Sequence, residues 1–540
     1  MLEPLAFILA AVAVIVMLQF LANRTGLPTA ALLTVAGLVY AVLPGPNLKL
    51  DPHAILTFVI PPLIYSAALN SSLLAIRKNL GAVISLSIGL VLATVMLVGI
   101  GVDLFVPGIG LAAAIALGAA VSPTDPVAAL AVGGRAALPP RLITIIEGEG
   151  LLNDATALTA LTVAVTAATS GGFSFADVVV RFLLAAAGGL LVGFAAAIAV
   201  RVLRSAVRDP LLVNCISLAT PFGAYLLGER LHVSGVLAVA VAGLVVGHDT
   251  PRFTSGASRL QASAVWRLVD FLLQGFVFLL IGQQITDVVR ALKAYPAATV
   301  VTAAIVSLGV VLLLRPLWLV LAQALRGALH MRLSKATARD DQRLTSREVV
   351  MLSWAGTRGV ISLAAIFTLP LVTSSGRPFP ARDLLIFCTY VVVVVTLAGQ
   401  GITFAPLARA LGVRADPADA ALVRSEARAA SVRAARSRLD QIAADGDVPG
   451  PVLAALRTRL DHQAWRHRQL LGRLKAADDT GPPTSTGYEA ALEARRAVID
   501  VQREELLRWR DAGHLPDSSL RILERELDHE ERTLPPHDDH

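Results

Sequence analysis

The succession of long apolar runs that fills the chain up to residue 411 limits its fold more than any other feature. Most of these runs are about 18 to 27 residues long, and about 20 residues make a helix that crosses a hydrocarbon core of about 30 Å. Lipid cannot hydrogen-bond to a bare backbone, so each run is expected to be helical. The sequence therefore predicts an all-α polytopic membrane protein with about 13 transmembrane helices. The predicted segments lie near residues 4–21, 27–43, 53–69, 80–102, 111–132, 142–168, 178–203, 211–227, 234–247, 265–285, 298–324, 349–372 and 384–411.

The charged residues are distributed unevenly, and their distribution predicts the orientation in the membrane. Of 540 residues, 55% are apolar and 16% are charged, and most of the charge follows residue 411. With the loop of Asn23 and Arg24 on the cytoplasmic side, the loops on that side carry roughly 17 Lys and Arg, against roughly 7 on the other. We therefore expect a multi-pass protein of the cell membrane, with its N-terminus outside and its C-terminus inside. The same excess explains the net charge of +7, so no nucleic-acid partner is expected.

After residue 411 the composition changes to Ala, Arg, Glu and Asp with helical periodicity. This periodicity is broken at residues 446–451 and 478–487, which predicts roughly three or four soluble helices. Arginines alternate with glutamates, a pattern typical of a solvated helical surface. We therefore expect a transmembrane domain over residues 1–411 and a cytoplasmic helical tail domain, regulatory in role, over residues 412–540.

Two of the apolar segments contain sequences that break a helix. The stretch SPTDPVAAL, residues 122–130, has two prolines that remove helix N–H donors and enclose Thr124 and Asp125. The stretch SWAGTRGVISL, residues 353–363, places two glycines around Thr357 and Arg358. Interrupted helices of secondary transporters expose carbonyls and helix ends to ions near the middle of the membrane. Segments 4 to 6 and 11 to 13 start on opposite sides and have their breaks at the same place, as inverted repeats do.

A third stretch, EGEGLLNDATAL at residues 147–158, puts Glu147, Glu149 and Asp154 into one apolar helix. Three buried charges would cost about 8 to 10 kcal/mol without partners or water. At 100° per residue, Glu147 and Asp154 share a face, whereas Glu149 points about 140° away from Asp154. Asp154 would lie about 18 Å deep and Glu147 about 7 to 8 Å deep, so their face can line a cytoplasmic funnel. Glu149 is expected to form a buried ion pair with Arg358.

Asp154 is the strongest candidate for an ion site in this helix. A carboxylate in a partly desolvated cavity can hold either a proton or a small cation. Asn153 beside it can ligate a cation through its amide oxygen but carries no proton. Competition of a cation and a proton for one carboxylate is sufficient for an exchange mechanism.

These stretches resemble the bacterial sodium/proton exchanger family, the monovalent cation:proton antiporters. The matching sequences are SPTDPVA (122–128), EGEGLLNDATA (147–157), FVFLLIGQQI (276–285) and GTRGVISLA (356–364), with FVIPPLIYSAA (58–68) and the tail residues 506–531 as further similarities. The resemblance implies a homodimer with a moving transport bundle, crossed by two unwound helices, and alternating access of an elevator type. It also implies electroneutral exchange of one cation for one proton, because the pair is Asn-Asp.

Carried over to this chain, the resemblance assigns a role to each candidate residue. Asp154 becomes the carboxylate that binds the ion or the proton, Asn153 its neighbour, and Thr124 and Asp125 the partners from the broken helix. Na⁺ is expected at Asp154, Asp125 and Thr124, with Glu149 and Arg358 as the supporting ion pair.

Two departures from the family pattern concern residues expected to line the site. Gly150 stands where relatives have Ser, and Ser66 stands where many have an acidic residue. Both replacements remove expected oxygen ligands, which leaves the choice among Na⁺, Li⁺ and K⁺ open.

The resulting interpretation is an antiporter that exchanges cytoplasmic Na⁺ or Li⁺ for external H⁺ and so contributes to sodium transport and pH homeostasis. The alternatives are a K⁺/H⁺ antiporter and a transport-inactive ion or pH sensor that signals through the tail. No P-loop, metal-ligand cluster or nucleophile triad is visible in the sequence, so neither an enzyme nor a cofactor is expected. Arg315 has two open interpretations: a position near the inner mouth, or a structural partner such as a carbonyl or an acid.

Overall fold

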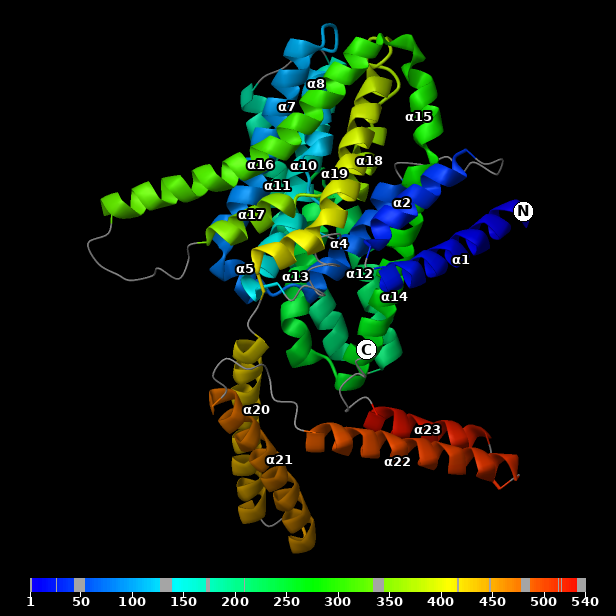
Figure 1. Cartoon of the computed structure of the whole chain (residues 1–540), viewed down its shortest axis with the longest axis vertical. Helices are drawn as coiled ribbons and strands as arrows, with labels where there is room; N and C mark the ends of the chain where they lie inside the picture. Colours follow the sequence, from blue (N-terminus) through cyan, green and yellow to red (C-terminus); the bar gives the residue numbers. More distant parts are fainter. Residues whose placement is uncertain are drawn as a thin grey trace. The chain divides into compact units, whose positions relative to one another are not determined.

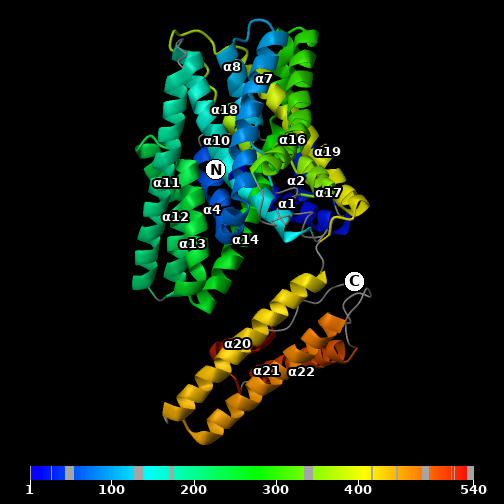
Figure 2. The same ribbon diagram turned by 90° about the vertical axis from the view of Figure 1, so that its left-hand side faces the viewer.

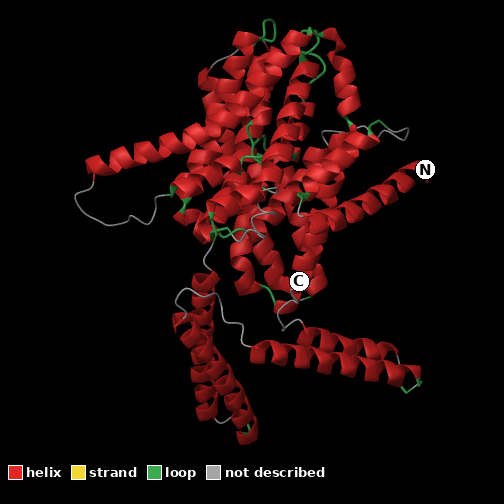
Figure 3. Cartoon of the chain, in the orientation of Figure 1, coloured by secondary structure: helices red, strands yellow, loops and turns green. Residues whose placement is uncertain are grey.

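The structure is a computed structural model that describes residues 2–25, 27–42, 54–126, 138–170, 175–207, 209–333, 344–414, 417–445, 448–476, 486–512, 514–515 and 517–531. Within these ranges the regular elements are helices, apart from one isolated β-bridge between Val372 and Pro378 (Figure 3). The expected all-α fold is therefore confirmed.

The chain divides into two compact units, Met1–Ala415 and Asp416–His540. The helices of the first unit, most of them labelled in Figure 1, are α1 (Leu2–Thr25), α2 (Thr29–Tyr40), the π-helix η1 (Ile55–Val59), α4 (Ile60–Asn70), α5 (Leu73–Lys78), α6 (Leu80–Ile84), the π-helix η2 (Ser85–Leu90), α7 (Val91–Phe105), α8 (Leu111–Val121), α10 (Pro140–Ser170), α11 (Phe175–Ala206), α12 (Pro210–Arg230), α13 (Gly235–Phe253), α14 (Gly256–Gln283), α15 (Ile285–Ala291), the short 3₁₀ turn η3 (Leu292–Ala294), α16 (Ala297–Leu333), α17 (Ser346–Trp354), α18 (Val360–Phe367) and α19 (Arg382–Leu411).

The outer surface of this unit is apolar, as a lipid-facing surface must be. Among the described residues, nine helices are long and apolar enough to cross a membrane, and three shorter apolar helical stretches accompany them. Leu191 of α11 and Leu313 of α16 are 72% and 71% exposed, and the same helices expose further leucines and isoleucines. A soluble protein rarely exposes so much contiguous apolar surface, so the unit is a multi-pass membrane domain.

The helices pack in two groups. Helices α11, α12 and α13 pack on one another, and α13 also packs along α4 (Figure 2). Helices α7, α8, α10, α16 and α19 form the second group, through the pairs α7 with α8, α8 with α10, α7 with α16 and α16 with α19. Helix α10, which carries the three carboxylates predicted from the sequence, also contacts α4 and α13, so it lies where the two groups meet.

Both predicted helix breaks are present. Helix α8 ends at Val121, and residues 122–126 that follow are not helical; the remainder of this predicted segment, residues 127–132, lies outside the described residues. Helix α17 ends at Trp354 and α18 begins at Val360, so the segment 349–372 is interrupted around Thr357 and Arg358.

Polar residues in the sequence fix several helix starts. Ser72, Asp209 and Ser234 each accept a hydrogen bond from a first-turn backbone N–H, at the starts of α5, α12 and α13. Thr345 and Glu348 form a reciprocal capping box at the start of α17. The interrupted segment therefore enters the membrane with a defined first turn.

The second unit consists of helical hairpins. Its helices are α20 (Pro417–Asp445), α21 (Gly450–Ala476), α22 (Thr486–Asp511) and α23 (Asp517–Glu531). Ion pairs Arg436–Asp461 at 2.8 Å and Arg457–Asp440 at 2.9 Å join α20 to α21. Arg503 of α22 contacts two carboxylates of α23, Asp528 and Glu531, at 2.6 Å each. The helices expected after residue 411 are therefore present, and charged pairs connect them.

A close crossing of α2 and α14 leads to the first prediction. A Cβ at Gly37 would overlap the carbonyl oxygen of Leu279 and lie 2.7 Å from the Cα of Gly282. Helix interfaces in membranes use such small residues to bring backbones together. We expect Gly37→Val to reduce the free energy of unfolding by about 1 to 3 kcal/mol, as overpacking does, measured as a lower thermal unfolding midpoint in detergent.

The matched control is Gly309→Val in α16, where a Cβ would meet no atom within 4 Å. Equal midpoints for the two variants would contradict the close crossing of α2 and α14.

Candidate functional site

The two interrupted helices bind each other through their backbones. The backbone N–H of Asp125 donates to the carbonyl oxygen of Thr357 at 2.7 Å. In return, the hydroxyl of Thr357 donates to the carbonyl oxygen of Asp125 at 2.7 Å. Peptide groups that leave a helix inside a membrane need such partners, because lipid offers none. The crossing of the two breaks therefore satisfies groups that the breaks themselves expose.

Glycines allow the two chains to approach at this crossing. A Cβ at Gly359 would overlap the carboxylate of Asp125. A Cβ at Gly356 would lie 2.6 Å from the Cδ of Arg315. Any larger residue at either position would push the chain away from a charged side chain, so the two glycines around Thr357 and Arg358 have a steric reason.

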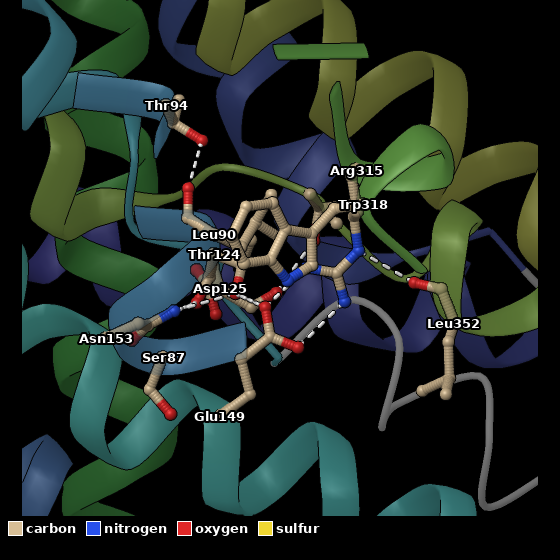
Figure 4. A network of polar contacts seen from close by, with 12 residues as sticks. Ser87, Leu90, Thr94, Thr124, Asp125, Glu149, Asn153, Arg315, Trp318 and Leu352 are labelled. Carbon is tan, nitrogen blue, oxygen red and sulfur yellow. Dashed lines mark hydrogen bonds and ion pairs between the residues drawn. The ribbon is translucent and has the colours of Figure 1, made fainter. Parts of the chain in front are cut away.

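Helix α10 presents Asn153 and Glu149 to the break after α8 (Figure 4). The amide nitrogen of Asn153 donates to the carbonyl oxygen and to the hydroxyl of Thr124, at 3.0 and 2.7 Å. The Thr124 hydroxyl then donates to the carboxylate of Glu149 at 2.8 Å. All three side chains are buried, and the chain of hydrogen bonds fixes the orientation of the Asn153 amide.

In that orientation the amide oxygen of Asn153 faces a region without a hydrogen-bond donor among the described residues. The Oδ1 atom of Asn153 is buried and has no hydrogen-bond partner in the described part of the chain. Asp154, next along α10, is only 5% exposed, and among the described residues no donor is bonded to it. Asp125 lies close enough to repel Asp154 when both are charged. The site is thus rich in oxygen acceptors and poor in donors, which suits a hard monovalent cation or a proton.

The predicted ion pair between Glu149 and Arg358 is wrong. Glu149 instead pairs with Arg315 of α16, whose two terminal nitrogens each reach one carboxylate oxygen, with Nη2 to Oε2 at 2.8 Å. The Nε of Arg315 donates to the carbonyl oxygen of Leu352 at 2.7 Å. Arg315 is 2% exposed and Glu149 is 2% exposed, so this is a buried bidentate pair. Arg315 therefore has a carbonyl and an acid as structural partners, as one of its two interpretations expected.

Arg358 binds backbone carbonyls in place of a carboxylate. Its Nε donates to the carbonyl oxygen of Val121, the last residue of α8, at 2.8 Å, and its Nη1 donates to that of Gly356. The carbonyls at the end of a helix have no partner within that helix and carry partial negative charge. Arg358 therefore caps the broken end of α8, which explains why it is not free to pair with Glu149.

Three further predicted residues lie elsewhere on these helices. The carboxylate of Glu147 is half-buried and accepts a hydrogen bond from Ser71 at 3.4 Å. The buried hydroxyl of Ser66 donates to Asp270 of α14. Gly150 packs against the ring of Pro126, where a Cβ would lie 2.7 Å from Cγ, so this close contact accounts for the absence of a serine. The structure thus groups Thr124, Asp125, Glu149, Asn153 and Asp154. It sets apart Ser66 of α4 and Glu147 of α10, whose partner Ser71 follows α4.

The sequence interpretation left the role of Arg315 open and missed Asp270, although the sequence contains a signal for both. Arg315 and Asp270 are charged side chains within apolar runs, which is costly unless each has a partner. The sequence could not name those partners, because they lie on helices far away in the chain.

The buried pair yields a second prediction. Replacing Arg315 by Gln leaves the Glu149 charge without its partner, which should cost about 3 to 5 kcal/mol of stability. Thermal unfolding in detergent checks this value. Arg201→Gln is the control, because Arg201 is 55% exposed in its pair with Asp249 and should contribute less than about 1 kcal/mol.

A double-mutant cycle separates the two arginines. Glu149→Gln should be coupled strongly to Arg315→Gln and weakly to Arg358→Gln. A stronger coupling to position 358 would overturn the corrected pairing.

The chain is similar to known transporters in sequence and in fold. Residues 8–410 match the family described as sodium/hydrogen exchanger, transmembrane. The uncharacterized Na⁺/H⁺ exchanger Rv2287 of Mycobacterium tuberculosis is 33% identical over 538 residues, which cover 98% of this chain and 96% of that protein. The sodium, potassium, lithium and rubidium/H⁺ antiporter of Bacillus subtilis is 32% identical over 385 residues, 69% of this chain and 56% of that protein.

A solved structure has the same fold. The sodium proton antiporter MjNhaP1 from Methanocaldococcus jannaschii, solved at pH 8, superimposes with a TM-score of 0.59 at 19% identity, covering 75% of this chain and 98% of that one. The match over residues 8–410 and the 33% identity to Rv2287 show that the chain belongs to the sodium/hydrogen exchanger family.

Proposed function

We propose that the protein is a secondary antiporter that exchanges cytoplasmic Na⁺ or Li⁺ for external H⁺, with Asp154 as the exchange site. One observation carries the proposal: Asp154 is buried at the crossing of two interrupted helices, beside Asp125 and the unpartnered Oδ1 of Asn153, with no donor bonded to it in the described part of the chain. Such a carboxylate needs either a proton or a cation to be neutral.

The need for neutralisation couples the two fluxes. When Asp154 carries a cation or a proton, the site can pass between the two sides of the membrane. When Asp154 is empty and charged, moving it through an apolar environment is costly. Each cation carried out therefore requires a proton carried in. The Na⁺ ligands in this scheme are Asp154, Asp125 and Thr124, with the amide oxygen of Asn153 facing the same place.

The remaining buried charges hold the site in shape. The Glu149–Arg315 pair is neutral as a unit and anchors Thr124 through its hydroxyl. Arg358 holds the broken end of α8 through the Val121 carbonyl. In this proposal neither arginine exchanges a proton. Both keep the crossing of the two interrupted helices in place while Asp154 exchanges its cation for a proton.

K⁺ is the second candidate cation. Gly150 contributes no hydroxyl, so the site has fewer oxygens than expected, and fewer ligands favour a cation that loses its hydration shell more easily. The Bacillus subtilis relative is named for potassium and rubidium as well as sodium and lithium. We expect the protein to work as a homodimer in the cell membrane. The distribution of Lys and Arg favours an orientation with the N-terminus outside and the tail in the cytoplasm.

The test is dissipation of an imposed pH gradient in inside-out vesicles after addition of NaCl, LiCl or KCl. Wild type should respond to at least one cation, and Asp154→Asn should lose the response, because an amide can bind neither a proton nor a cation tightly. Asp249→Asn, in the pair with Arg201 at the end of α13, removes a carboxylate outside the site and should retain it.

The absence of a response to any of the three cations, from wild type that is folded and inserted, would contradict antiport. That result would favour the alternative of an ion or pH sensor that signals through the tail.

Stoichiometry gives a further prediction. Asn153 does not titrate, and in the proposed scheme Asp154 alone exchanges its proton for the cation, so one cation moves for one proton and no net charge moves. After an Na⁺ concentration jump on a solid-supported membrane, the protein should therefore exchange Na⁺ for H⁺ without producing a sustained current. A sustained current of the wild-type protein, absent in Asp154→Asn, would mean that more than one proton moves per cation.

A further inference from the structure

Asp270 is a carboxylate inside an apolar span that the exchange site does not use. It lies on α14, in the predicted segment 265–285, and it is half-buried. An ionisable side chain within an apolar span is costly unless it has a partner or a role. One carboxylate oxygen accepts a hydrogen bond from Ser66 of α4, and the other, Oδ1, is buried without a partner in the described part of the chain.

Polar side chains line the part of α4 that contacts Asp270. The amide of Asn70 donates to the carbonyl oxygen of Ser66 at 2.9 Å, and the hydroxyl of Ser71 donates to the carboxylate of Glu147 at 3.4 Å. The end of α4 thus lies between two carboxylates, Asp270 on α14 and Glu147 on α10. Within the described ranges neither carboxylate forms an ion pair with an arginine or a lysine, so neither negative charge has a basic side chain beside it.

The carboxylate of Glu147 lies on the face of α10 that also carries Asp154. Glu147 and Asp154 are seven residues apart on α10, hence on one face and about 10.5 Å apart along the axis. In the proposed orientation, α10 enters from the cytoplasm and α4 ends there. Glu147 and Asp270 therefore lie on the cytoplasmic side of the exchange site, on α10 and α14, both of which contact α4.

We propose that Asp270, held by Ser66, is a cation-binding residue of the cytoplasmic entrance, where a monovalent alkali cation contacts Oδ1 before it reaches Asp154. The inference rests on the proposed antiport for its transport readout. A carboxylate at an entrance with low-dielectric walls raises the local cation concentration and replaces part of the hydration shell. The Ser66 hydroxyl fixes one oxygen, so that the other is free for the cation.

The first experiment measures the cation dependence of pH-gradient dissipation for Asp270→Asn in proteoliposomes. The apparent KM for the transported cation should rise about tenfold, as expected when a carboxylate no longer concentrates the cation. The maximal rate at saturating cation should stay within about twofold of wild type, because the exchange site is intact. Asp270→Glu should keep the KM near wild type.

A reciprocal exchange of the two side chains is the sharper variant. Ser66→Asp combined with Asp270→Ser keeps one carboxylate and one hydroxyl at the same contact, now on opposite helices. This double variant should restore the KM that Asp270→Asn loses. An unchanged KM in Asp270→Asn, a loss confined to the maximal rate, or a double variant no better than Asp270→Asn would each overturn the inference in favour of a purely structural hydrogen bond.

Cation binding without transport separates this inference from the proposed function. Broadening of the ²³Na resonance by solubilised Asp154→Asn reports binding outside the exchange site. We expect residual broadening that the Asp154→Asn/Asp270→Asn variant loses. If wild type does not transport but this difference is present, antiport fails and the entrance site stands. If wild type transports and the difference is absent, the entrance site fails alone.

Discussion

The structure depends on how the peptide groups of two interrupted helices find partners inside the membrane. A helix that breaks in lipid exposes N–H and C=O groups that neither lipid nor bulk water can satisfy. Here the breaks satisfy each other, through the reciprocal hydrogen bonds of Asp125 and Thr357. Arg358 adds a guanidinium to the free carbonyls of Val121 and Gly356. Without this crossing, the buried polar side chains around it would have no fixed frame.

Within that frame Glu149 and the two buried arginines have partners, whereas Asp154 has none among the described residues. Glu149 and Arg315 neutralise each other, and Arg358 faces the negative helix end. Thr124 and the amide of Asn153 use their donors within the network, so none is left for Asp154. The same arrangement that stabilises the crossing therefore leaves a carboxylate that must take its positive charge from solution, which is the physical basis of the proposed exchange.

The sequence predicted the features that a local pattern determines. Apolar length gave the helices, the prolines around Asp125 and the glycines around Arg358 gave the breaks, and the carboxylates in residues 147–158 gave α10 as the site helix. It failed where two partners compete. Arg315 and Arg358 are both deep in apolar segments, and only the packing of α16 on the rest of the bundle decides which one reaches Glu149. The contact of Ser66 with Asp270 likewise requires knowledge of how α4 meets α14.

Competition between a cation and a proton for Asp154 is the central claim, and proton release on cation binding tests it most directly. Purified protein in weakly buffered detergent solution is titrated with NaCl, LiCl or KCl, and the pH change is recorded. We expect release of up to one proton per protomer from wild type and none from Asp154→Asn. Competition would be contradicted if wild type bound the cation saturably and released no proton at every pH at which the protein remains folded.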